Sequence, residues 1–119
     1  MAVTIRRMLK RADFLTVKVG GKRVSTQAFA LQWLDVATEA GLSVGYTASI
    51  AAVGNSVARN KARRRLKAAF DEACRLNSEA KGQGKWLVIV AKMPVLTIGY
   101  EYLLKDMKKA LAEAGVAGC

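Results

Sequence analysis

Hydrophobic residues recur along this chain with two different periods, which predict a mixture of helices and strands. Helical spacing occurs in three segments, residues 7–18, 55–77 and 98–114. Alternating or continuous apolar runs predict strands in four others, residues 24–26, 29–34, 43–48 and 86–91. Gly20-Gly21 is expected to end the first helix, and Pro94 to close the last strand.

The order of these elements predicts an α+β fold, a two-layer α/β sandwich of a small mixed sheet with helices on one side. The strand–helix–strand portion, from Ser43 to Ala91, implies a parallel pair of strands within that sheet. With 119 residues and 52% hydrophobic composition, the chain fits one domain spanning 1–119, with a real apolar core.

The longest predicted helix has two chemically distinct sides when its residues are placed about 100° apart. One side is an apolar stripe expected to pack on the sheet: Ala58, Ala62, Leu66, Ala69, Ala73 and Leu76. The opposite side collects polar and basic side chains: Asn60, Arg63, Arg64 and Lys67. Arg59 and Arg65 flank the stripe, where their aliphatic stems can lie along it while the guanidinium groups reach outward.

The positive charge is concentrated in two short stretches. The formal net charge is +11, with no histidine. Residues 59–67 hold six basic side chains and no acidic one, and residues 1–23 hold seven basic side chains against Asp13 alone. Such clustering indicates an anionic partner, and guanidinium forks match phosphate oxygens bidentately. The alternative is a solvated helix face, but such faces usually mix charges, and no acid occurs between Glu39 and Asp71.

The residues around this helix resemble a known family, the bacterial ribonuclease P protein component. The resemblance rests on the run from Val53-Gly54-Asn55 through Arg59-Asn60-Lys61 to Lys67, in which Lys61 stands where the family usually has arginine. It extends to four other matching segments: Arg11-Ala12-Asp13-Phe14, Gly20-Gly21-Lys22-Arg23, Val44-Gly45-Tyr46-Thr47 and Val88-Ile89-Val90-Ala91-Lys92. Ser49-Ile50-Ala51-Ala52 departs from the family, which usually has a lysine pair there.

The resemblance implies an RNA-binding subunit that assists a catalytic RNA in cutting the 5′ leader from precursor tRNA. The expected RNA-binding residues are Arg59, Asn60, Lys61, Arg63, Arg64, Arg65 and Lys67. It also implies a left-handed strand–helix–strand crossover, and Mg²⁺ held mainly by the RNA. A groove beside the N-terminal helix would hold the leader, lined by Phe14, Lys18 and Lys22; alternatively, Phe14 is core and pins that helix to the sheet.

Catalysis by the protein's own side chains is not expected. No histidine is present for acid–base chemistry, and the nine carboxylates are scattered along the chain. Cys74 and Cys119 are too few and too poorly placed for a disulfide framework or a zinc site. No apolar run approaches the ~20 residues of a membrane span, so we expect a cytoplasmic protein, monomeric within its ribonucleoprotein. Two alternatives remain open: a structural nucleic-acid-binding protein such as a small ribosomal protein, and, more weakly, a stand-alone nuclease.

Overall fold

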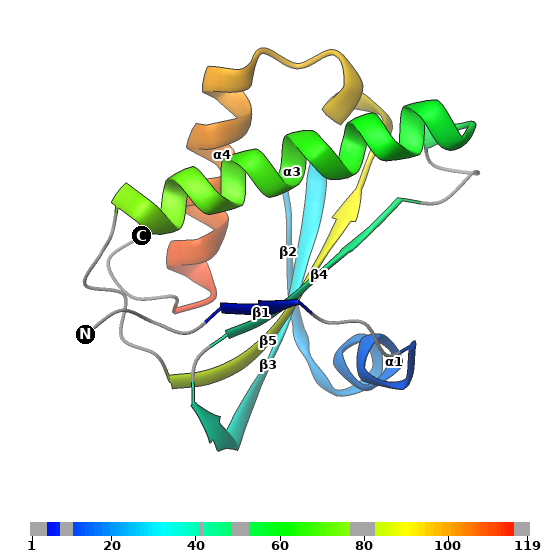
Figure 1. Cartoon of the computed structure of the whole chain (residues 1–119). Coiled ribbons are helices and arrows are strands. Elements are labelled where there is room, and N and C mark those ends of the chain that lie inside the picture. The colour runs from blue at the N-terminus through cyan, green and yellow to red at the C-terminus, as the bar shows by residue number, and fades with distance from the viewer. Residues whose placement is uncertain (1–4, 8–10, 41, 49–52, 77–82, 116–119) are drawn as a thin grey trace.

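A computed structural model describes residues 5–7, 11–40, 42–48, 53–76 and 83–115 of the chain. In chain order the elements are β1 (Ile5–Arg7), α1 (Arg11–Gly20), β2 (Lys22–Ser25), β3 (Phe29–Ala40), β4 (Leu42–Thr47), α3 (Ser56–Leu76), β5 (Gln83–Ala91), the 3-10 helix η1 (Met93–Leu96) and α4 (Tyr100–Glu113) (Figure 1). The departing segment 49–52 and the terminal Cys119 lie outside the described residues, as does the side chain of Cys74.

The strands form one mixed sheet in the order β1-β4-β5-β3-β2. β4 pairs in parallel with β5, so the predicted strand–helix–strand unit around α3 is confirmed. β2 and β5 both pair antiparallel with β3, and β1 adds a parallel edge beside β4. The α+β class with a small mixed sheet is therefore confirmed, while the left-handed crossover stays a prediction.

Helices α3 and α4 cover one face of the sheet and enclose the main core (Figure 1). Side chains on β5 alternate between the two faces, as the period of two in a strand requires. Leu87 and Ile89 point into the main core, whereas Trp86, Val88 and Val90 lie on the opposite face. The continuous apolar run of this strand therefore reflects cover on both of its faces.

Helix α1 lies on the opposite face of the sheet from α3 and α4 (Figure 1). Its fully buried Val17 packs on Val88 in a small second core. The expectation that all helices lie on one side is therefore wrong. The predicted start of α1 at Arg7 is also wrong. Arg7 lies in β1, where it pairs with Val44 of β4, and the helix begins only at Arg11. Strand pairing with a distant segment outweighs a weak local helical pattern.

Gly21, the residue after α1, allows a close approach between α1 and β3. A Cβ at Gly21 would lie 2.5 Å from the carbonyl oxygens of both Trp33 and Val17. Only glycine fits there without a backbone shift. The chain therefore turns directly from α1 into β2, close to the observed helix end at Gly20.

Strands β3 and β5 are longer than their apolar patterns predict. The pattern in β3 stops at Leu34, yet the strand continues to Ala40, with a register shift between Asp35 and Ala40. Asp35 stands opposite Lys85, whose Nζ donates a hydrogen bond to its carboxylate. Cross-strand ion pairs stabilise a sheet without contributing to the alternation of apolar residues. The hydrophobic pattern therefore did not predict that β3 continues through Asp35.

Candidate nucleic-acid interface

The first turn of α3 is set by the Val53-Gly54-Asn55 segment. Gly54 has a φ of 107°, a conformation that favours glycine. The Asn55 side-chain Oδ1 then accepts a hydrogen bond from the Ala58 N–H at 3.0 Å. Asparagine is a preferred N-cap because it satisfies an N–H that has no partner within the helix. The turn and the cap together fix where the basic helix begins.

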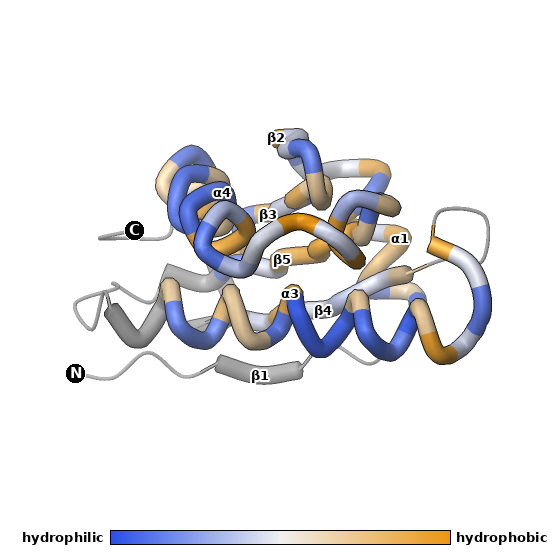
Figure 2. The backbone as a smooth tube through the Cα atoms, turned by 90° about the horizontal axis from the view of Figure 1, so that it is seen from above, coloured by the Kyte–Doolittle hydropathy of each residue, from blue (hydrophilic) through white to orange (hydrophobic). Residues whose placement is uncertain are grey.

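The buried side of α3 is the predicted apolar stripe. Its described members Ala62, Leu66, Ala69 and Ala73 are buried, and Ala58 is half-buried. The stripe also includes Phe70, which the prediction omitted and whose ring meets Tyr46 of β4 edge-on at a centroid distance of 6.4 Å. Figure 2 shows the resulting alternation of hydrophilic and hydrophobic residues along the helix. Packing of this stripe determines which side chains point outward.

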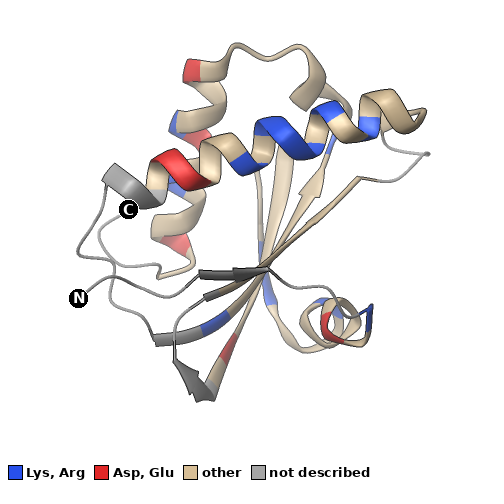
Figure 3. Ribbon diagram, in the orientation of Figure 1, with Lys and Arg blue, Asp and Glu red and all other residues tan. Residues whose placement is uncertain are grey.

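Several basic segments lie along the first half of α3 in Figure 3, with no acidic segment among them. Asn60, Lys61, Arg64 and Lys67 are exposed and Arg63 is half-buried, as the helical positions predict. The Arg63 Nη1 donates a long hydrogen bond of 3.5 Å to Asn60 Oδ1. Apart from Asn60, the exposed polar side chains of this face therefore carry a positive charge and can bind an anion.

The charges on α3 are distributed against the helix dipole. No acidic residue occurs in the first turn, and the basic residues begin at Arg59, close to the positive end of the helix. Cations near an N-terminus are disfavoured, and a helix selected for its own stability carries acids there. An anionic partner would reverse this penalty. The arrangement therefore favours a binding function over a solvated face.

Asp71 engages one of the outward cations. Its Oδ2 lies 2.7 Å from the Nζ of Lys67, with side-chain exposures of 52% and 62% respectively. An exposed pair four residues apart contributes little to stability. It does hold Lys67 against an intramolecular carboxylate, which competes with an external phosphate.

We expect Asp71→Asn to strengthen RNA binding by about two- to fivefold, the equivalent of roughly 0.4–1 kcal/mol for an exposed pair. The melting temperature should change little. Binding titrations against a structured RNA measure the effect, with Asp106→Asn on α4 as a control that removes the same charge elsewhere. An equal gain in both variants would show that only net charge matters.

Arg65 and Arg59 lie on opposite flanks of the buried stripe, as predicted, but the Arg65 guanidinium does not reach outward. Its Nη1 donates to the Val95 carbonyl oxygen at 2.6 Å and its Nη2 donates to the Ile98 carbonyl oxygen. Arg59 is half-buried, and its Nε has no hydrogen-bond partner among the described residues. The helix position was predictable, whereas the distant carbonyl partners of Arg65 were not.

The predicted leader residues are only partly brought together. Phe14 is half-buried against the small second core formed by Val17 and Val88. Lys18 is exposed one turn after Phe14, on the same flank of α1. Lys22 is opposite Trp33 in the β2–β3 register, and Trp33 packs into the main core. Alternation along the strands therefore places Lys22 on the face of α3 and α4, away from Phe14.

Two residues on the α1 face were missed as candidates. Arg23 is opposite Gln32 in the register and is exposed, so it is the basic residue of β2 that shares a face with Phe14. Trp86 of β5 is half-buried beside the second core. The alternation of side chains along β2 and β5 would have placed both residues on this face, but only once the position of α1 was known.

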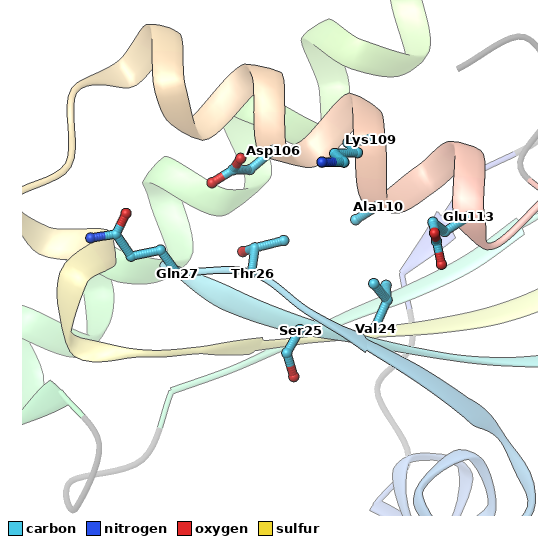
Figure 4. A pocket seen from close by; sticks show the side chains of 8 residues that line it. All are labelled: Val24, Ser25, Thr26, Gln27, Asp106, Lys109, Ala110 and Glu113. Carbon is cyan, nitrogen blue, oxygen red and sulfur yellow. The ribbon is translucent and has the colours of Figure 1, made fainter.

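A separate groove lies between the β2–β3 turn and α4 (Figure 4). Its lining residues are Val24, Ser25, Thr26, Gln27, Asp106, Lys109, Ala110 and Glu113. The two carboxylates, Asp106 and Glu113, outnumber the one ammonium group of Lys109. This sign balance is unsuited to phosphate, so the groove is not part of the candidate interface.

Two further classes of site are not found in the described part of the chain. No group of three or more His, Cys, Asp or Glu side chains is gathered so as to hold a metal ion there. Among the described helices, none is long and apolar enough to cross a membrane.

Comparisons with known proteins identify the family. A family model described as Ribonuclease P matches residues 4–115. The ribonuclease P protein component of Paramagnetospirillum magneticum is 35% identical, over 97% of this chain and 86% of that protein. That of Gluconacetobacter diazotrophicus is 34% identical, over 99% of this chain and 98% of that protein.

Solved structures share the fold. The RNase P protein of Staphylococcus aureus superposes with a TM-score of 0.76 at 23% identity, covering 92% of this chain and 95% of that one. That of Thermotoga maritima gives a TM-score of 0.65 at 20% identity, covering 87% and 96%. The predicted resemblance is thus confirmed over nearly the whole length. The chain belongs to the bacterial ribonuclease P protein family, the accessory protein subunits of an endoribonuclease that matures the 5′ end of tRNA.

Proposed function

We propose that the chain is one RNA-binding domain, residues 1–119, whose outward α3 face binds the catalytic RNA subunit. The observation that carries this proposal is the run of basic residues on α3 with no acidic residue among them, of which Lys61, Arg64 and Lys67 are exposed. Each guanidinium or ammonium group that meets a phosphate releases condensed counterions. The proposed contacts come from Arg59, Asn60, Lys61, Arg63, Arg64 and Lys67.

Asn60 differs from its neighbours because its amide offers both a donor and an acceptor. It is exposed in the middle of the basic row, with its Oδ1 near Arg63. Phosphates cannot use an acceptor, but a base edge or a 2′-hydroxyl can donate to one. Asn60 is therefore the residue of this face suited to a nucleoside rather than to the backbone.

The α1 face of the sheet is proposed to hold the 5′ leader of precursor tRNA. Phe14 and Trp86 supply rings that are half-buried and so partly accessible. Lys18 and Arg23 supply positive charge on the same side. Rings accept any base by stacking, and cations follow the backbone, so a leader of any sequence can bind.

Chemistry is assigned to the RNA subunit. Among the described residues, no group of three or more His, Cys, Asp or Glu side chains is gathered so as to hold a metal ion. In line with the family resemblance, we propose that Mg²⁺ is held mainly by the RNA, and that the protein contributes charge and positioning. The proposal places a protein monomer in a cytoplasmic ribonucleoprotein without a membrane partner.

Reconstitution tests this division of labour. Protein and a bacterial ribonuclease P RNA together should cleave precursor tRNA at a magnesium concentration where that RNA alone is slow, because the basic face offsets phosphate repulsion. Purified protein without RNA should give no cleavage at any magnesium concentration. Cleavage that survives treatment of the protein preparation with nuclease would contradict the proposal, as would a failure to stimulate the RNA.

A further inference from the structure

The basic run of α3 is divided by the direction in which its side chains point. Arg64 is exposed on the outward face, whereas its neighbour Arg65 is turned by about 100° toward the flank nearest η1. Two arginines adjacent in sequence therefore have different surroundings. One is available to RNA, and the other has its guanidinium engaged within the protein.

Arg65 contacts the connection between β5 and α4 at two points. Its Nη1 donates to the carbonyl oxygen of Val95, a fully buried residue of η1, at 2.6 Å. Its Nη2 donates to the carbonyl oxygen of Ile98, immediately before Gly99, the N-cap of α4. Neither η1 nor α4 has a side-chain cap. The Arg65 guanidinium group thus links the β5–α4 connection to α3. That connection has no side-chain caps of its own.

Contacts on both flanks of α3 limit its rotation about its own axis. On the η1 side, Arg65 is followed two turns later by Glu72, whose Oε2 accepts a hydrogen bond from the Tyr100 hydroxyl at 3.3 Å. On the β4 side, the Phe70 ring meets Tyr46. Because the apolar stripe consists largely of alanines, it offers few side chains that interlock with the sheet. The flank contacts are therefore expected to determine which way the outward face points.

We propose that Arg65 is a positioning residue: it holds the roll of α3 through the Val95 and Ile98 carbonyls and does not bind phosphate. This inference rests on the proposed role of the α3 face in RNA binding. It removes Arg65 from the predicted set of RNA contacts. The inference also gives a role to the β5–α4 connection, which is distant in sequence from the basic run. Its carbonyl groups help to fix the orientation of the basic side chains of α3.

The test compares Arg65→Met with Arg64→Met, which remove the same charge from adjacent positions and keep most of each aliphatic stem. For Arg65→Met we expect a melting temperature lower by roughly 5 °C, because two partly buried carbonyl groups lose their donor. Affinity of the folded protein for ribonuclease P RNA should fall about three- to tenfold, while the slope of log affinity against log salt stays unchanged. Arg64→Met should show the opposite pattern, an unchanged melting temperature and a slope smaller by about 0.7–0.9.

Affinity is measured at a temperature where circular dichroism shows each variant fully folded, so a merely structural role would leave it unchanged. Arg65→Lys keeps the charge but lacks the planar two-pronged geometry of the guanidinium group, so it should fall between the parent and Arg65→Met. If Arg65→Met does not fold, the salt slope and melting temperature of Arg65→Lys decide. A slope that falls in Arg65→Met as in Arg64→Met, or an unchanged melting temperature, overturns the inference. An unchanged slope in Arg64→Met would instead count against the proposed RNA face.

Discussion

Replacing Arg63, Arg64 and Lys67 together with alanine is expected to weaken binding to ribonuclease P RNA by roughly a hundredfold, at about 1 kcal/mol per lost contact. The slope of log affinity against log salt should fall by about 2 to 2.7, because each lost phosphate contact removes roughly 0.7–0.9. The fold should be retained, since Arg64 and Lys67 are exposed and Arg63 is only half-buried. Filter binding or fluorescence titration across a salt series measures both quantities.

A charge-matched control separates local contact from net charge. Lys105, Lys108 and Lys109 lie on α4, interspersed with Asp106 and Glu101. Replacing these three lysines with alanine removes the same total charge from a surface of mixed sign. It should change the salt slope far less than the α3 triple variant. Equal losses in the two variants would mean that the outward face of α3 is merely solvated and that RNA senses only the overall charge.

The parts of the fold that the sequence predicted are those whose hydrophobic period is strong. The stripe of α3 was predictable because Ala62, Leu66 and Ala69 recur at helical spacing, and a helix of 21 residues keeps that phase throughout. The outward direction of Arg64 and Lys67 follows from the same phase. Periodicity therefore predicts the direction of these candidates, while their charge and the family resemblance identify them as RNA-binding residues.

The parts that the sequence did not predict depend on partners far along the chain. Arg65 finds its carbonyls 30 and 33 residues away. Arg7 joins a strand because Val44 is its partner in β4. Whether α1 covers the same face as α3 depends on how Val17 and Phe14 meet Val88 and its neighbours. The local sequence pattern of an amphipathic helix does not predict which face of a sheet the helix packs on.

That choice of face governs the candidate leader site. Once α1 is placed beside Trp86 and Val90, the register of β2 shows that Arg23, and not Lys22, shares its side of the sheet. Lys18 and Lys22 were both selected for the positive charge of the N-terminal stretch, and charge along a sequence does not report strand alternation. The aromatic candidate, Phe14, is the member of the predicted set that both the resemblance and the structure place against the α1 face.

Phe14→Leu is expected to weaken binding of precursor tRNA by roughly fivefold to a hundredfold, the range given by about 1–3 kcal/mol for stacking on one base. Binding of mature tRNA, which lacks the leader, should change little. Phe14 is half-buried against Val17 and Val88, so leucine retains most of the apolar contact but has no ring for a base to stack on. Paired titrations of ribonuclease P holoenzyme with precursor and mature tRNA measure the difference.

The control and the stability measurement distinguish stacking from core packing. Leu15, the next residue of α1, is 49% exposed and is absent from the second core, so Leu15→Ala should leave both RNA affinities unchanged. If stacking is the role of Phe14, the Phe14→Leu variant melts within a few degrees of the parent and discriminates less between the two RNAs. If its melting temperature falls by many degrees and both affinities fall alike, the ring serves to pin α1 to the sheet. The leader would then follow another path across the protein, because a loss shared by both RNAs cannot come from contacts to the leader, which only precursor tRNA carries.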